Sequence, residues 1–208
     1  SLLAIIFLLI AIKENKFFYW LFIPVFLFIA FFSKQTPAGH IILLCIFFMT
    51  YYSFIKKNTQ WIFPVILGTS VSLIFLCVFL LVEKVDFNLF LTQYFLFPQS
   101  IGLKRLDDLN FTLRGNILHF KFIYLASIPL IYFTLAGIFK NRLYLRSDEF
   151  FNNIIILFFT SSLIFHQLIT KNQTFIFFLI PLILGFSHAH FKFKKGNIYF
   201  TYFLIFLC

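Results

Sequence analysis

Six apolar runs of 15 to 22 residues divide this chain, and they constrain its fold more than any other feature. An α-helix rises roughly 1.5 Å per residue, so about 20 apolar residues cross the hydrocarbon core of a bilayer. The runs cover residues 17–33, 40–55, 61–82, 122–139, 151–170 and 174–188, and shorter apolar stretches lie at 1–12 and 197–208. We therefore predict an all-α fold, a polytopic bundle with about six complete and two partial transmembrane spans.

The composition also indicates an integral membrane protein. Hydrophobic residues make up 62% of the 208 positions, and the mean hydropathy is +0.98. A soluble domain of this size leaves about 30% of its unfolded surface in contact with water and needs polar residues to cover it. The formal charge of +10 comes from basic residues grouped between apolar runs, which indicates membrane topology. The expected surroundings are a lipid bilayer, and we expect no nucleic-acid partner.

The distribution of Lys and Arg predicts the orientation, because short cytoplasmic loops carry an excess of these residues. Alternate connections carry ten of them: Lys13, Lys16, Lys56, Lys57, Lys140, Arg142, Arg146, Lys192, Lys194 and Lys195. The short connections on the opposite side carry two, Lys34 and Lys171. We therefore place the first set in the cytoplasm and connections 33–39, 83–121 and 170–173 at the outer face, with the bacterial inner membrane as the expected location.

The chain is predicted to form a single transmembrane domain over residues 1–208, with 83–121 as a long outer loop. The first part of this loop, residues 85–98, is apolar with interspersed polar residues, and it is predicted to be an interfacial helix that ends at Pro98. Residues 99–116 are polar and predicted to be rich in turns. Because Ser1 opens inside an incomplete apolar run, we expect an internal or C-terminal fragment of a longer protein.

The first candidate site lies in the stretch Ser33-Lys-Gln-Thr-Pro-Ala-Gly39, between two apolar runs. Pro37 and Gly39 are expected to break the helix, so that backbone N–H groups are able to face a ligand. Lys34, followed by Gln35, is suited to binding the phosphate of a lipid-linked substrate as a point charge. The competing interpretation is a lysine that extends to the membrane interface and binds no ligand.

A second polar cluster, His166-Gln-Leu-Ile-Thr-Lys-Asn-Gln173, follows a later run at the same predicted face. His166 and Lys171 are five positions apart, so they do not share one face of an unbroken helix. Ionisable residues near membrane spans are candidate functional residues, although the same residues also suit a tight hairpin loop. We take His166 and Lys171 as candidate substrate-binding residues.

Candidate acid–base residues are few at the outer face. The carboxylates there are Glu83, Asp86, Asp107 and Asp108, for which a solvated loop is a commoner explanation than a general base or metal ligand. The histidines and the three cysteines show no metal-ligand spacing. The sequence therefore identifies no cofactor and no metal ligand, and nothing in it supports a need for a divalent metal.

Several short motifs resemble membrane-embedded glycosyltransferases of the GT-C class. These are Ser33-Lys-Gln-Thr-Pro37 at the end of a span, His119-Phe-Lys-Phe-Ile-Tyr124 before an aromatic-rich span, and Lys171 ahead of Phe178-Leu-Ile-Pro181. The groups that the chain is most similar to are the protein O-mannosyltransferases and the aminoarabinose-transferase-like bacterial enzymes. Gln35 stands where that pattern usually has glycine.

The resemblance implies inverting transfer of a sugar from a polyprenyl-phosphate donor to a glycan, lipid or protein acceptor at the periplasmic face. It also implies substrate contacts from Lys34, Gln35, His119, His166 and Lys171. The catalytic acid of this class lies in the first outer loop, which is expected upstream of Ser1, so the catalytic residue is unknown here and the fragment is expected to be inactive alone.

Two other functions fit the same sequence. A transporter of a lipid-linked solute would need polar residues at the midplane of its spans, whereas the runs here are mostly Phe, Ile and Leu. A polymerase or ligase of surface polysaccharide would share the outer face and the lipid-linked substrate, and Arg105, Arg114 and His119 are compatible with it.

Overall fold

The computed structural model describes residues 1–107, 112–170 and 176–193, together with Phe203 and Phe206. Regular structure in this part of the chain is helical throughout, which confirms the all-α prediction. The chain forms two compact units, residues 1–109 and 110–208, each described below by itself. The elements of the first unit are α1 (Leu2–Glu14), α2 (Phe17–Ser33), α3 (Gln35–Lys56), α4 (Ile62–Val82), α5 (Phe87–Leu91), η1 (Thr92–Leu96) and α6 (Phe97–Asp107).

Four helices of the described residues are long and apolar enough to cross a membrane: α3, α4, α7 (Lys121–Lys140) and α8 (Asp148–Thr170). Two shorter apolar helices, α2 and α9 (Leu179–Phe193), lie near the expected 17–33 and 174–188 runs. The helix bounds agree with the predicted runs to within a few residues. Most of the predicted partial span 197–208 lies outside the described residues.

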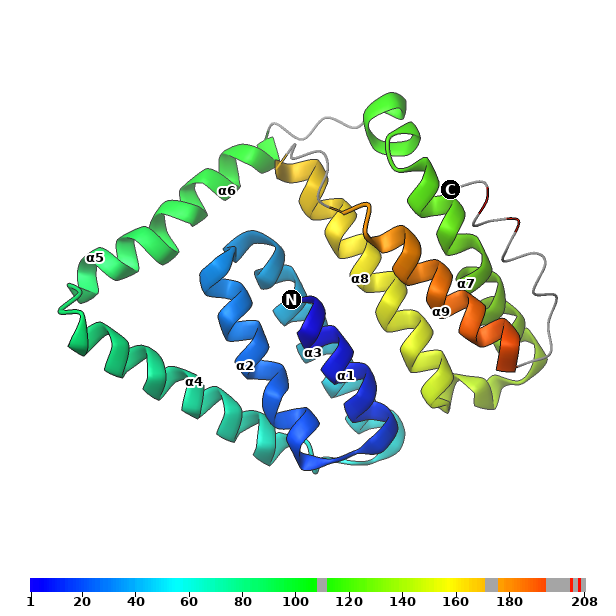
Figure 1. The fold of residues 1–208 in the computed structure, drawn as a ribbon, viewed down its shortest axis with the longest axis horizontal. Helices are drawn as coiled ribbons and strands as arrows, with labels where there is room; N and C mark the ends of the chain where they lie inside the picture. The colour runs from blue at the N-terminus through cyan, green and yellow to red at the C-terminus, as the bar shows by residue number, and fades with distance from the viewer. Residues whose placement is uncertain (108–111, 171–175, 194–202, 204–205, 207–208) are drawn as a thin grey trace. The chain divides into compact units, whose positions relative to one another are not determined.

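Helix α2 is the centre of the first unit and packs against α1, α3 and α4 (Figure 1). On α4 the buried residues Pro64, Gly68 and Ser72 recur every fourth position and so form one narrow face. A Cβ added to Gly68 would overlap the carbonyl oxygen of Leu21 and would lie 2.8 Å from Cγ of Pro24. Small residues on this face therefore let the α2 and α4 backbones approach closely, as in many membrane helix pairs.

The predicted cytoplasmic end of this unit is held by a polar and aromatic network. Asn15, in a left-handed conformation with φ 49° after α1, donates to Oε1 of Gln60 at 3.0 Å and accepts from Nε1 of Trp20 at 3.1 Å. The Trp20 ring is 1% exposed and lies 5.6 Å from the ring of Tyr52. The connections that follow α1 and α3 are thus brought together, and Trp20 belongs to the core of the unit.

At the other end of α2, a single residue connects two helices. Lys34 has extended backbone angles, φ −158° and ψ 102°, between α2 and α3. Residues Pro37 and Gly39 lie inside α3, so the prediction that they break the helix is wrong. Proline is tolerated in the first helical turn because the N–H groups there have no partner within the helix. The helix break is at Lys34 itself, which we call the elbow.

The outer segment of the first unit is more helical than predicted. Helix α5, the π-helical turn η1 and α6 follow one another without interruption from Phe87 to Asp107, so Pro98 does not end the helix (Figure 1). The π-helical turn directly precedes the proline, and one extra residue in a turn is a common way to accommodate it. The prediction of a turn-rich segment from residue 99 is therefore wrong for residues 99–107. Leu113–Leu118 forms a second π-helical segment, η2, so the prediction also fails there.

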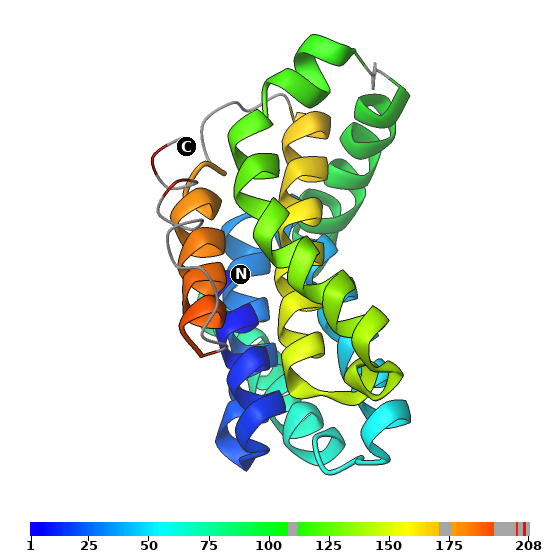
Figure 2. The ribbon, with the colours of Figure 1, turned by 90° about the vertical axis from the view of Figure 1, so that its right-hand side faces the viewer.

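In the second unit α7 packs against α8 and α9 (Figures 1 and 2). A short 3₁₀ helix, η3 (Arg142–Arg146), connects α7 to α8 and contacts both. Tyr144 of η3 lies over Gly137 of α7, where an added Cβ would be 2.7 Å from the ring atom Cδ1. Its hydroxyl accepts a hydrogen bond from Nδ2 of Asn153 on α8 at 3.1 Å. Tyr144 thereby fixes the connection to both helices.

We expect Tyr144→Phe to destabilise the second unit, because it leaves the Nδ2 of Asn153, a residue only 1% exposed, without this acceptor. A buried polar group that loses its partner costs about 1–3 kcal/mol, and a chain of this size loses roughly 2–4 °C of melting temperature for each kcal/mol. Burial, together with the charge of Glu149, raises the pKa of Tyr144 to about 12, so titration of this group does not affect stability at neutral pH. The unmodified unit is expected to lose stability as the pH rises from about 10 to 12, because the folded state disfavours the phenolate. Thermal unfolding in detergent measures the effect, and Tyr132→Phe at a 63% exposed ring is the control. Equal melting temperatures for the two variants would contradict the prediction.

Candidate functional site

An aromatic cavity of about 350 Å³ lies in the first unit, between α2, α4 and α5. Its walls are apolar or aromatic and carry no charge; they consist of Phe28, Phe32, Phe75, Leu76, Phe79, Leu80, Val85, Phe90 and Tyr94. The volume is within the range of small-molecule sites in proteins, about 300–1,000 Å³. Such a cavity is suited to a hydrocarbon chain and has no group that would pair with a charge.

The cavity follows from the way α2 and α4 cross. The two helices approach closely at Gly68 and Leu21, and Figure 1 shows them diverging toward the elbow. Aromatic pairs four residues apart line the divergence on each of three segments: Phe28 and Phe32, Phe75 and Phe79, Phe90 and Tyr94. Residues four apart share one face of a helix, so each pair presents two rings to the same space.

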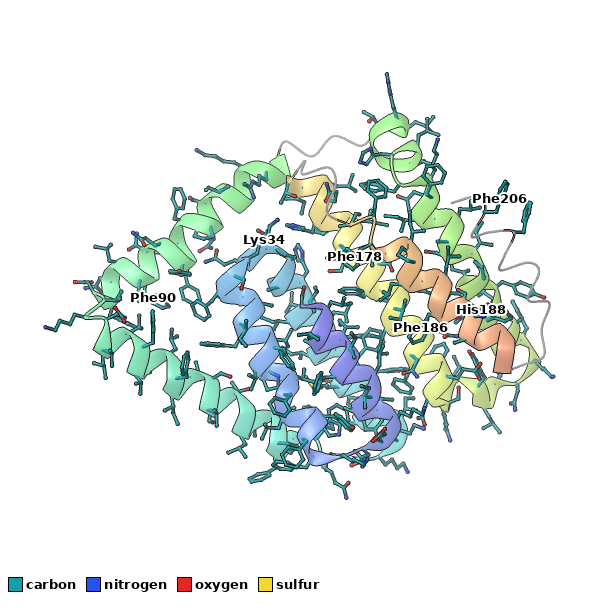
Figure 3. All side chains as sticks on the ribbon, in the orientation of Figure 1. Lys34, Phe90, Phe178, Phe186, His188 and Phe206 are labelled. Atoms are coloured by element: carbon teal, nitrogen blue, oxygen red, sulfur yellow. The ribbon has the colours of Figure 1, made fainter. Side chains whose placement is uncertain are left out.

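Gln35 lies at the rim of this cavity, and Lys34 directly precedes it in the chain. The side chain of Gln35 donates from Nε2 to the backbone carbonyl of Tyr94, a cavity-lining residue, at 2.9 Å. Phe32, two positions before Lys34, lines the cavity and its ring lies 5.5 Å from that of Tyr94. Figure 3 shows Lys34 at the end of α2 and Phe90 on α5, near the corner where α4 meets it. The structure thus places a cation close to an apolar cavity.

The candidate residues of the second unit gather at one end of it. His119 directly precedes α7, and its ring lies 6.0 Å from that of Phe177, in the turn before α9. The Nε2 atom of His119 is buried and has no hydrogen-bond partner among the described residues. His166 is in the last turns of α8 and is 1% exposed. Lys171 lies outside the described residues, as does most of the predicted outer connection 170–173.

Lys34 and Gln35 belong to the first unit and His119 and His166 to the second. Within each unit, segments distant in sequence come together at one end: the elbow with η1, and His119 with the turn before α9.

One of the carboxylates predicted at the outer face, Asp86, has a structural role. Oδ1 of Asp86 accepts from the backbone N–H groups of Asn88 at 2.7 Å and Leu89 at 3.0 Å, and so caps the start of α5. Nothing is described for the Asp107 side chain or for Asp108. Across the described residues, no group of three or more His, Cys, Asp or Glu side chains could hold a metal ion.

No protein-family model matches the chain, and neither a curated protein nor a solved structure matches it. The assignment of a site therefore depends on the geometry of these residues. The sequence indicated Lys34 and Gln35 as candidates but did not indicate the cavity. The available signal was the aromatic spacing of four on three segments, which is weak in a chain with 37 phenylalanines.

Proposed function

We propose that this chain is part of a membrane-embedded glycosyltransferase and binds its polyprenyl-phosphate-linked sugar donor. The observation that carries the proposal is the hydrogen bond from Gln35, the residue that follows Lys34, to Tyr94 of a largely apolar, aromatic cavity. A polyprenyl phosphate has the matching two parts, an apolar chain and an anionic head. The hydrocarbon chain of the donor would enter the cavity, and its phosphate would pair with the Lys34 ammonium. This would be a strong charge-assisted contact near a low-dielectric region.

The resemblance to GT-C enzymes supplies the remaining roles. Transfer would occur at the periplasmic face to a glycan, lipid or protein acceptor, and His119, His166 and Lys171 would contact the substrates. The acid that deprotonates the acceptor is expected in a part of the protein upstream of Ser1.

Donor binding tests the proposal directly. The protein in lipid nanodiscs is titrated with farnesyl phosphate and, in parallel, with farnesol, which has the same hydrocarbon chain and no charge. We expect binding of farnesyl phosphate to be at least about tenfold tighter, since a charged contact contributes about 1.5–3 kcal/mol and 1.4 kcal/mol is a factor of ten. Equal affinities for farnesyl phosphate and farnesol would show that the phosphate makes no contact in the site. Failure of the complete protein to release polyprenyl phosphate from a sugar-linked donor would reject the transferase.

One observation favours a transporter as the second candidate. Helix α8 buries the polar residues Asn153, Thr160, His166 and Gln167 along its length, with Thr160 near its middle. Buried polar residues at this depth in a membrane span are typical of solute pathways. A flux assay in proteoliposomes distinguishes the two functions: movement of a lipid-linked sugar across the bilayer without sugar transfer would favour the transporter.

A further inference from the structure

Residues Phe87–Leu96, which comprise α5 and η1, form one wall of the aromatic cavity. Phe90 and Tyr94 face the cavity, and Phe90 is only 6% exposed. Four other large side chains of this segment are about half exposed or more: Phe87, Leu89, Phe95 and Leu96. The segment therefore forms one wall of a cavity that is partly open, since Phe75 and Phe79 in its α4 wall are 67% and 49% exposed.

The segment is held to the elbow by ring contacts and by a hydrogen bond. The Phe32 ring lies 6.1 Å from that of Phe90, nearly parallel at 23°, and 5.5 Å from that of Tyr94. Nε2 of Gln35 donates to the Tyr94 carbonyl at 2.9 Å. This hydrogen bond joins α3, beside Lys34, to the middle of the covering segment.

Pro98 explains why the Tyr94 carbonyl accepts from a side chain. In an α-helix the carbonyl of residue 94 accepts from the N–H of residue 98, and proline has none. The turn Thr92–Leu96 adopts π-helical bonding instead, with the Phe97 N–H donating to the Thr92 carbonyl. The amide of Gln35 donates to this carbonyl, for which Pro98 supplies no α-helical donor.

The other end of the segment has the features of a hinge. Lys84 has a left-handed backbone with φ 50°, which breaks the helical path between α4 and α5. The Asp86 side chain caps α5 from within the same segment. Since α5 has its own cap, it keeps its helical start when its contacts with α2 are lost.

We propose that Phe87–Leu96, moving with the α6 helix that continues it, is a lid that swings about residues 83–86 to widen the cavity for a hydrocarbon chain, and that Gln35 is its latch. The lid depends on the geometry of the first unit alone. Only the identification of the entering chain as that of a polyprenyl phosphate rests on the proposed function. Because the latch residue adjoins Lys34, binding at the elbow and closure of the cavity involve consecutive residues.

Alkylation of a thiol inside the cavity tests the lid. Leu76→Cys is introduced at a cavity-lining position, with Cys77 and Cys208 replaced by alanine, and its reaction with N-ethylmaleimide is timed in detergent. Gln35→Met keeps the side-chain length and removes the N–H donor. Loss of a hydrogen bond of about 0.5–1.5 kcal/mol should raise the alkylation rate at position 76 about two- to tenfold.

Two controls are built into the chain. Native Cys77, next to position 76 and exposed, should react at the same rate with Gln35 or with Met at position 35. In a Pro98→Ala background the backbone N–H at position 98 reaches the Tyr94 carbonyl, so Gln35→Met should change the rate at position 76 less than about twofold.

An unchanged rate at position 76 in Gln35→Met would overturn the latch. Increased reactivity of Cys45, which is fully buried, would show general loosening of the unit and would also overturn it. The assay contains no lipid phosphate, so its outcome is separate from the donor titration. A lid effect without farnesyl phosphate binding would reject only the proposed donor.

Discussion

Lys34→Ala should lower the affinity for farnesyl phosphate about 10- to 100-fold and leave the affinity for farnesol unchanged. The variant removes the ammonium at the elbow but leaves the nine cavity-lining residues in place. A hydrogen bond to a charged group contributes about 1.5–3 kcal/mol, which sets the size of the loss. In the complete protein, the same change should reduce sugar transfer by a similar factor at low donor concentration. Parallel titrations of both ligands in nanodiscs measure the effect.

Lys104→Ala is the matched control for charge. It removes an exposed lysine from α6 of the same unit, and Lys104 does not line the cavity. We expect it to change neither affinity by more than about twofold. Lys34→Arg keeps the positive charge and should recover most of the binding. A loss of farnesol binding in Lys34→Ala, or equal losses in Lys34→Ala and Lys104→Ala, would contradict a specific phosphate contact.

Gly68→Ala should destabilise the first unit by about 1–3 kcal/mol, the usual cost of overfilling a packed interior. The added methyl group meets the Leu21 carbonyl, which is backbone of α2, and the rigid ring of Pro24 on the same helix. Relief therefore requires α2 and α4 to move apart, because no flexible side chain is there to yield. Since α2 and α4 also form two walls of the aromatic cavity, binding of farnesol should weaken as well.

Gly39→Ala separates this effect from helix propensity. Gly39 lies in α3 with no atom within 4 Å of an added Cβ, so alanine should be neutral or stabilise the helix by up to about 1 kcal/mol. Melting temperatures in detergent compare the two variants. If Gly68→Ala is as stable as Gly39→Ala, then the close approach of α2 and α4 does not limit stability.

The apolar runs predicted the helices well because a long uninterrupted run has few other ways to satisfy its backbone in an apolar environment. They predicted the connections less well. Pro37 and Pro98 were both expected to end or break a helix, but the first lies in an opening turn and the second follows a π-helical turn. The effect of a proline depends on which carbonyl loses its donor and what replaces it, and Gln35 lies 59 residues from the carbonyl that it satisfies.

The candidate site was predictable in part for a related reason. A lysine between two apolar runs stands out in the sequence, so Lys34 and Gln35 were candidates from the sequence alone. The cavity beside them depends on the crossing of α2 and α4 at Gly68, and neither helix alone indicates which of its faces will diverge from the other. The pattern Pro64, Gly68, Ser72 was readable as a close-packing face, but its partner was not.

The elbow at Lys34 also bears on how the chain is able to change over evolution. The connection between α2 and α3 is one residue long, whereas residues 57–61 connect α3 to α4 and residues 83–86 connect α4 to α5. An inserted residue that extends α3 would rotate the helix start by about 100° and turn Gln35 away from Tyr94. Homologous sequences should therefore tolerate insertions and deletions at 57–61 and keep a constant length at position 34.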